Sequence, residues 1–292
     1  MFGYSRQAYY KRKQSEEKEI ELQEKVISMV MQIRIKMPRL GTRKLYYLLK
    51  SDFKKESINI GRDRLFNILR VNNLLVKPKK SYQITTNSKH WLKKHKNQIN
   101  NIEISEPEQV LVSDITYIKT LEGHNYLSLV TDAYSKKIMG HNLADNMKGE
   151  ESEKALEMAI RNRKYKSRPT IHHSDRGLQY CSASYQKILN RNNIRPSMTE
   201  QYDPYENAIA ERVNGILKDE FNLDKSFTNL KQAKAVIKDI IEVYNNDRPH
   251  LSCEYLTPYQ MHNQKKIKRK QWKKKTSKVN ALEVQYLKVF LL

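Results

Sequence analysis

The chain of 292 residues carries 55 Lys and Arg side chains against 32 Asp and Glu, which gives a net charge of +23. This excess favours a polyanionic partner, and nucleic acid is the first expectation. A hydrophobic content of 38% still supports a packed core, so the composition excludes a chain that is disordered throughout.

No segment of the sequence has the pattern of a secretion or membrane signal. The first 13 residues lack an apolar core, and no apolar run approaches the roughly 18 residues that cross a bilayer. Cys181 and Cys253 are too few for a disulfide framework, which is typical of a reducing compartment. We therefore expect a cytoplasmic protein with no membrane partner.

The excess charge is concentrated at the two ends of the chain. Residues 1–100 carry 24 basic and 8 acidic side chains, residues 101–264 carry 21 and 23, and residues 265–292 carry 10 and 1. This pattern predicts DNA contacts on either side of a metal-dependent centre, although the terminal lysines would also aid solubility alone. The expected regions are residues 1–76, a basic linker over 77–105, a core over 106–264 and a basic tail over 265–292.

The first region begins with a predicted helix over residues 16–37. Its apolar residues recur at spacings of four, three and four, which places them on one face; they are Val26, Val30, Ile33 and Met37. Pro38 ends the helix because its ring removes a backbone donor. The apolar repeat covers about three turns, which is short of the three to four heptads of a stable coiled coil. No leucine zipper is expected here.

Two shorter helices complete this region. Thr42 is expected to cap the first, and the second covers residues 62–71. Three helices with clustered cations are typical of a helix-turn-helix domain, although an ordinary helical bundle fits the same periodicity. In the former case cations hold DNA phosphates; the candidates are Arg43, Lys44, Arg62 and Arg64.

The centre of the chain alternates between strand and helix patterns. Runs of β-branched and aromatic residues predict an antiparallel meander over residues 109–119, 126–134 and 137–143. Further elements are expected at 150–165 (helix), 169–173 (strand), 182–192 (helix), 194–198 (strand) and 205–221 (helix). The order βββαβαβα is that of the ribonuclease H-like fold. We therefore expect an α/β fold with a five-stranded mixed sheet, preceded by an all-α domain.

Three carboxylates occupy places that suggest metal chemistry. Asp114 lies in the middle of a predicted strand, where a charge is costly unless it is paired or binds a cation. Asp175 follows another strand directly, and Glu211 points away from the apolar stripe of its helix. Each alone has an ordinary structural explanation. Together they suit two divalent ions held about 3.5–4 Å apart, and oxygen ligands are those that Mg²⁺ prefers.

Four sequence motifs stand in order along the chain. They are VSDITYI (112–118), HSDRGLQY (173–180), NAIAER (207–212) and YNNDRPH (244–250). They resemble the motifs of DDE transposases of the insertion sequence three family and, more distantly, those of retroviral-type integrase cores. Sixty residues separate the two aspartates and 35 separate Asp175 from Glu211, the characteristic last gap of that family. The likeness covers about residues 40–261, including the helix-turn-helix segment.

The resemblance implies a transposase that cleaves and transfers DNA strands at the ends of an insertion sequence. Asp114, Asp175 and Glu211 would be catalytic and would hold two Mg²⁺ or Mn²⁺ ions. The implied partners are the terminal repeats, target DNA, further copies of the chain on paired ends, and the upstream reading-frame product as a fusion or a complex. The implied location is the bacterial cytoplasm or nucleoid.

Several positions keep alternatives open. Glu206 is a rival third carboxylate, ranked lower because it falls inside the apolar stripe and leaves only 30 residues after Asp175. Lys218 lies two helical turns after Glu211, where it would hold a DNA phosphate or face solvent. His173 and Arg248 are expected to pack structurally rather than to act in catalysis. The alternative function is a noncatalytic DNA-binding regulator or a decayed transposase remnant.

Overall fold

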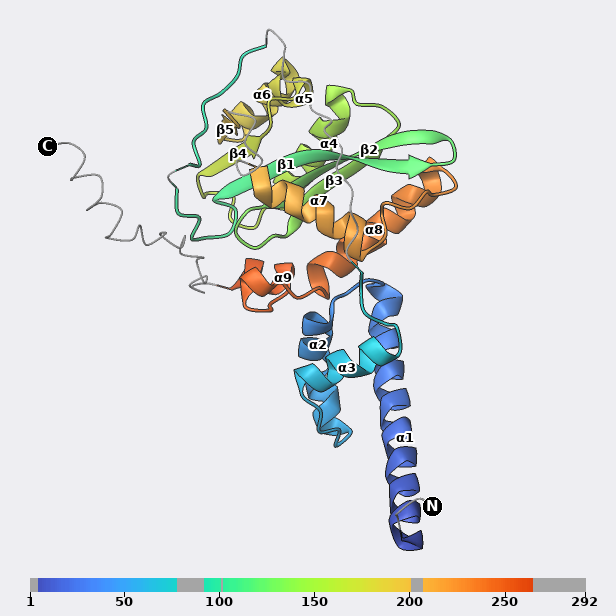
Figure 1. Cartoon of the computed structure of the whole chain (residues 1–292). Coiled ribbons are helices and arrows are strands. Elements are labelled where there is room, and N and C mark those ends of the chain that lie inside the picture. The colour runs from blue at the N-terminus through green and yellow to red at the C-terminus, as the bar shows by residue number, and fades with distance from the viewer. Residues whose placement is uncertain (1–4, 78–91, 101, 201–206, 265–292) are drawn as a thin grey trace, which may run out of the picture.

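The computed structural model describes residues 5–77, 92–100, 102–200 and 207–264. A helical unit at the N-terminus adjoins a mixed α/β core (Figure 1). The helical unit consists of α1 (Arg6–Lys36), α2 (Thr42–Lys55) and α3 (Arg62–Val71). The predicted basic tail and Glu206 lie outside the described residues.

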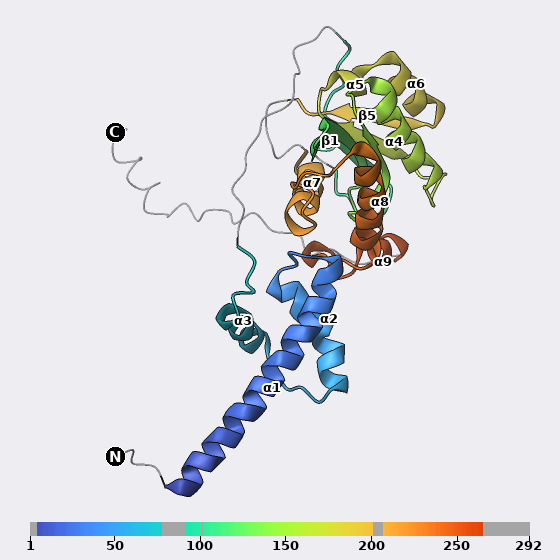
Figure 2. The same cartoon turned by 90° about the vertical axis from the view of Figure 1, so that its right-hand side faces the viewer.

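Helix α1 is longer than the sequence pattern predicts. It begins at Arg6, ten residues before the expected start, because the Ser5 side chain caps it by accepting a hydrogen bond from the Ala8 backbone N–H at 3.2 Å. Only Val26 and Val30 are buried along its length. Its N-terminal half projects beyond α2 and α3 in both views (Figures 1 and 2), so no apolar period marks that half in the sequence.

The two following helices match the sequence closely. Helix α3 has the predicted bounds, whereas the expectation that Thr42 caps α2 is wrong. Gly41 occupies the cap position with extended backbone, and Thr42 is the first helical residue, with its side chain buried. The buried faces of α2 and α3 then pack with α1 into one apolar cluster.

The core is a five-stranded sheet of order β3-β2-β1-β4-β5. Its strands are β1 (Val110–Thr120), β2 (Gly123–Asp132), β3 (Ile138–Ala144), β4 (Thr170–Ser174) and β5 (Ile194–Met198). Strands β1, β2 and β3 form the antiparallel meander, and β4 and β5 run parallel to β1. The predicted ribonuclease H-like order is confirmed, and its central strand is β1.

Helices cover both faces of the sheet. They are α4 (Gly149–Arg161), α5 (Leu178–Cys181), α6 (Ala183–Arg191), α7 (Ala208–Glu220), α8 (Leu230–Asn246) and α9 (Pro258–Asn263), with a 3₁₀ turn η2 (Leu251–Cys253). Helices α4 to α6 pack on one face, and α7 and α8 on the other. Gly140 allows α4 to approach β3, because a Cβ there would lie 2.0 Å from the Ala155 carbonyl oxygen.

Residues 92–100, expected as part of a linker, are packed along the edge strand β5. The Gln98 backbone N–H donates to the Ser197 hydroxyl at 2.9 Å, and its side-chain amide donates to the Pro196 carbonyl at 2.9 Å. An open strand edge would otherwise present unpaired backbone groups to other chains. This segment therefore covers one edge of the sheet.

The helical unit and the core share one apolar cluster. Leu40 and Leu45 of the helical unit belong to the same group of buried residues as Leu217 and Tyr244 of the core. None of the helices in the described part of the chain is both long and apolar enough to cross a membrane.

Candidate active site

Strand pairing brings two of the three predicted carboxylates together. Strand β4 runs parallel to β1, and Val112 is the register partner of His173. Two residues further along the same direction, β1 carries Asp114 and the chain leaving β4 carries Asp175. Side chains two positions apart on a strand share a face, so both aspartates emerge on the same side of the sheet.

Local hydrogen bonds hold each aspartate. Asp114 Oδ1 accepts from the Ile115 backbone N–H at 2.8 Å, and Oδ2 accepts from the Asn214 side-chain amide at 2.7 Å. Asp175 Oδ1 accepts from the Gly177 backbone N–H at 3.0 Å. A Cβ at Gly177 would lie 3.0 Å from that same oxygen, so the turn after β4 favours glycine.

Helix α7 brings Glu211 to the aspartates. The Asn207 side-chain amide, at the start of this helix, donates to the Ser113 carbonyl of β1 at 3.1 Å. Asn214, one turn after Glu211, donates to Asp114. Both asparagines are buried, whereas Glu211 is exposed in the first turn. The helix is thus attached to β1 before and after Glu211, which leaves that carboxylate facing solvent beside the aspartates.

The pKa of Asp114 reflects the charges of the other two carboxylates. Burial, and then the negative charge of Asp175, raise the pKa of Asp114 to about 7, with a smaller contribution from Glu211. Partial burial also raises the pKa of Glu211. Like charges that share a site oppose ionisation. The raised pKa of Asp114 therefore records a cost of ionising it in this position.

The donor chemistry fits a hard divalent cation. Carboxylate oxygens are the ligands that Mg²⁺ and Mn²⁺ prefer, and a bound cation would favour the ionised form of Asp114. The side-chain oxygens of Asn207 and Asn214 are buried without a hydrogen-bond partner among the described residues. As the side chains stand, no three His, Cys, Asp or Glu residues of the described ranges are close enough together to hold a metal ion.

Comparison with known proteins identifies the family. Two models of the integrase core domain match residues 104–204 and 192–258. The insertion element IS600 uncharacterized 31 kDa protein of Shigella sonnei is 34% identical over 270 residues, which cover 88% of this chain and 94% of that protein. The transposase InsF for insertion sequence IS3A of Escherichia coli (strain K12) is 35% identical over 197 residues, 67% of this chain and 68% of that protein.

The chain belongs to the IS3 family of transposases. It is accordingly a polynucleotidyl transferase of the DDE class. Among solved structures, a chain of the simian T-cell lymphotropic virus intasome, in complex with PP2A regulatory subunit B56 gamma, is similar at 19% identity and a TM-score of 0.48. The match covers 81% of the transposase and 76% of that chain.

Lys218 of the transposase lies on the same helix as Glu211 and interacts electrostatically with Asp114. Burial lowers the pKa of Lys218, and the negative charge of Asp114 opposes that shift. The ammonium is therefore within electrostatic reach of the aspartate. Lys218 is partly buried rather than a fully solvated lysine.

The cations of the helical unit differ in what they contact. Arg43 is exposed. Arg62 pairs with Asp63 at 2.9 Å and Arg64 pairs with Glu19 at 2.5 Å, both as exposed ion pairs. Lys44, the fourth candidate, has its ammonium 2.6 Å from Glu220 of the core in a largely buried ion pair.

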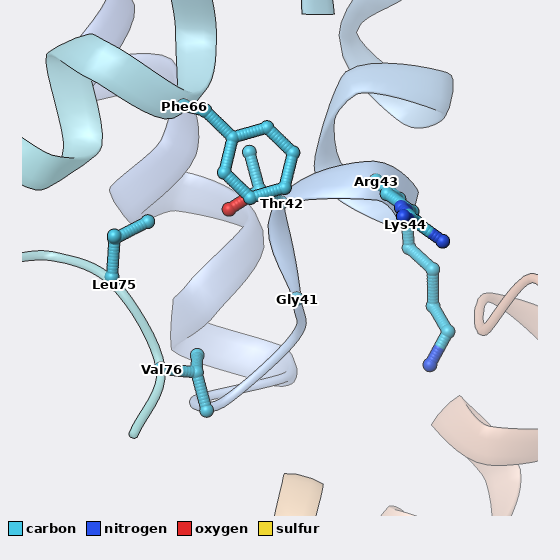
Figure 3. Close-up of a pocket in the computed structure, with 7 residues that line it drawn as sticks. All are labelled: Gly41, Thr42, Arg43, Lys44, Phe66, Leu75 and Val76. Carbon is cyan, nitrogen blue, oxygen red and sulfur yellow. The ribbon is translucent and has the colours of Figure 1, made fainter. Parts of the chain in front are cut away.

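The pocket beside Lys44 lies in the helical unit and not at the carboxylates. It has a volume of about 340 Å³ and is lined by Gly41, Thr42, Arg43, Lys44, Phe66, Leu75 and Val76. Figure 3 shows Phe66, Leu75 and Val76 on one side and Lys44 pointing away from them. The pocket therefore exposes the stem of Lys44, while its charged end is directed to the core.

His173 and Arg248 are buried among protein groups, in line with the packing roles expected for them. His173 is fully buried, with Nδ1 2.9 Å from the Ser197 hydroxyl. Arg248 is 1% exposed and forms two hydrogen bonds with Glu220. His95 contacts β5 through its backbone N–H, which lies 3.5 Å from the Met198 sulfur.

The role of Asn214 was not predicted from the sequence. Its spacing of three from Glu211 on one helix was a usable signal, since residues three apart share a helix face. The partner, Asp114, is a hundred residues away, so only the packed structure shows the hydrogen bond between them.

Proposed function

We propose that Asp114, Asp175 and Glu211 are the catalytic, metal-binding residues with which this transposase cleaves and joins DNA strands. The main support is the position of Asp114, a carboxylate in the central strand whose pKa is raised by burial and by the two neighbouring acids. Two Mg²⁺ or Mn²⁺ ions, when bound, would activate the attacking oxygen and stabilise the leaving oxygen.

Each residue of the chain has a distinct task in this proposal. Asn214 orients the Asp114 carboxylate through its amide, and Gly177 orients Asp175 through its backbone N–H. Glu211 is exposed and so remains accessible to DNA. Lys218 lies near Asp114, where it would hold a phosphate next to the reacting one.

The reaction then proceeds by two displacements at one site. In the first, the oxygen of water bonds to phosphorus at the end of the element and the bond to the 3′ oxygen breaks, which leaves a 3′-OH. In the second, that 3′ oxygen bonds to another phosphorus and releases a different 3′ oxygen. The leaving oxygen takes up a proton each time, and no protein–DNA bond forms.

The triad can be tested by isosteric replacement. We expect Asp114→Asn, Asp175→Asn and Glu211→Gln each to abolish cleavage and joining of DNA that carries the element's ends, with Mg²⁺ present. DNA affinity should change little, because these side chains hold cations and not phosphates. Asp219→Asn removes an exposed carboxylate from the same helix and should leave both activities intact.

Two results would contradict this assignment. Strand joining by the Glu211→Gln protein would exclude Glu211 as a ligand. Loss of joining in a Glu206→Gln protein, with Glu211→Gln active, would show that the rival glutamate completes the triad.

We further propose that the transposase acts as an assembly on paired ends, with the upstream reading-frame product fused to it or bound to it. The family resemblance supports this proposal. If it is correct, the fused protein should discriminate terminal repeats from random duplex more strongly than this chain alone in a binding titration. Equal and strong discrimination by the chain alone would assign end recognition to its own helices.

A further inference from the structure

The last residue of α7 connects three parts of the molecule. Glu220 Oε1 lies 2.6 Å from Lys44 Nζ of α2 and 2.7 Å from Arg248 Nη2, in the segment after α8. Glu220 Oε2 accepts from Arg248 Nε at 2.9 Å. The Glu220 backbone carbonyl also accepts from the Arg39 backbone N–H at 3.1 Å. The helical unit thus contributes both a side chain and a backbone donor to the end of α7.

These contacts are shielded from solvent. The exposed fractions of the side chains are 18% for Lys44, 15% for Glu220 and 2% for Arg248. By contrast, the ion pair between Lys25 and Glu56 within the helical unit leaves both side chains 50% exposed. Ion pairs removed from water are screened less by salt than exposed pairs. The Lys44–Glu220 contact is therefore a stronger constraint on geometry than the surface pairs.

Helix α7 is the element that also carries Glu211. Glu220 stands nine positions after Glu211, which is about 13.5 Å along the helix at 1.5 Å per residue. Asn207 and Asn214 attach the first part of this helix to β1. A helix held at both ends cannot change its tilt unless one of these attachments breaks. Glu211 thus lies on the same rigid helix whose last residue contacts the helical unit.

We propose that Glu220 is a positioning residue through which docking of the helical unit, by way of Lys44, sets the position of α7 and of Glu211. Through this contact, DNA held by the helical unit affects the geometry of the cleavage site. The inference rests on the proposed catalytic role of Glu211.

The sharpest test replaces Lys44 with Met in the full chain. This change keeps the apolar stem and leaves Glu220 bonded to Arg248. Small displacements of reacting groups cost up to about a hundredfold in rate. We expect cleavage at saturating DNA to fall about tenfold or more, while DNA affinity stays within about twofold.

Hydrogen exchange should quicken at the backbone amides of α7, and Lys44→Arg should restore both the cleavage rate and the exchange rate. Lys25→Met is the matched control and should change neither.

A double variant separates coupling from loss of folded protein. In a Glu220→Gln background, Lys44→Met should cause little further loss of cleavage, because its partner is already uncharged. Rates are compared per folded molecule, measured by thermal unfolding. Wild-type cleavage by Lys44→Met, or a loss matched by an equal loss of DNA affinity, would overturn the inference.

Failure of the inference and failure of the triad give different results. If Glu211→Gln still cleaves, the catalytic assignment is wrong whatever Lys44 does. If Glu211→Gln is inactive and Lys44→Met cleaves normally, only the positioning role of Glu220 is excluded.

Discussion

Asp114 shows how a single residue balances function against stability. Its carboxylate lies in the central strand beside two other acids, and its raised pKa records the cost of ionising it there. A protein folds in spite of such a cost when the group serves another purpose. A divalent cation would remove the repulsion, so the unfavourable charge is consistent with a metal site.

This cost predicts how stability depends on pH. Between about pH 4 and pH 7 the folded carboxyl of Asp114 keeps a proton that the unfolded chain has released, so stability falls as the pH rises through this range. Above pH 7 Asp114 is ionised in the metal-free fold, so the free energy of unfolding is lowered by the full cost of that ionisation. We expect Asp114→Asn to stabilise the metal-free protein by about 2 kcal/mol at pH 8 and hardly at all at pH 4. The Asn214 amide can turn to present its oxygen to the new side chain.

Denaturant unfolding at the two pH values measures this effect. Mg²⁺ should raise the melting temperature of the wild type and much less that of the variant, because a ligand stabilises only the state that binds it. Glu150→Gln, which removes an exposed carboxylate, is the control. Equal stabilities of the wild type and Asp114→Asn at pH 8 would show that Asp114 carries no such cost.

At the scale of an element, the short helix α9 is joined to the sheet by a buried polar network. His262 Nε2 lies 3.1 Å from Glu108, and Nδ1 lies 3.4 Å from Asp132 and 3.2 Å from the Ser135 hydroxyl. Burial opposes the charged imidazole, but the hydrogen bonds to Asp132 and Glu108 outweigh it and raise the pKa of His262. The imidazolium thus bridges two carboxylates, one just before β1 and one at the end of β2.

We expect this network to stabilise the core most in mildly acidic solution. The contribution of a group with a raised pKa is complete below its unfolded value, near 6.5, and is lost as the pH rises through its folded value. His262→Gln should therefore cost about 3 kcal/mol at pH 6, where it leaves buried carboxylates unpaired, and clearly less at pH 9. Denaturant unfolding of the wild type and the variant at both pH values measures this difference in cost. His124→Gln, at an exposed histidine, is the control. A cost that is the same at both pH values would mean that His262 stays neutral.

At the scale of the whole molecule, the basic helical unit adjoins a core of nearly balanced charge. Three arginines of this unit, Arg43, Arg62 and Arg64, remain proposed DNA contacts, and two of them must leave exposed acidic partners to reach DNA. Exposed pairs are weak, so phosphate can replace those partners at little cost.

Salt dependence measures how many of these arginines bind phosphate. For every arginine that binds a phosphate, its replacement should make the slope of log affinity against log salt shallower by about 0.9. Replacing all three with Gln should therefore reduce the slope by up to about 2.7. A matched triple replacement on α4 and α6, at Lys154, Arg161 and Arg191, removes the same charge from the far side of the sheet. If both triple variants show the same change, only net charge matters and the three arginines have no specific role.

Much of the fold could be predicted because its signals are local. Strand β5 and helix α3 have the predicted bounds, since each is a short periodic run flanked by residues that end it. The order of strands and helices could likewise be predicted, because apolar residues recur at a period of about 2 in strands and about 3.6 in helices. Helices that close the core are expected from the sequence without bounds, although the buried Ala233, Ile237, Ile241 and Tyr244 of α8 recur at helical spacing. The first turns of α1 carry no such pattern because they pack against nothing in the described part of the chain.

By itself, the sequence determined the family, the fold order and the three candidate carboxylates, because motifs and their spacing are written along the chain. Only the tertiary structure decided that Lys44 pairs with Glu220 and that Asn214 holds Asp114. Residues 92–100 likewise become a cover for β5 only in the folded molecule. These pairings join residues about 100 to 176 positions apart, and no local propensity encodes such partners. They arise when the sheet and its two helical layers close around a common core.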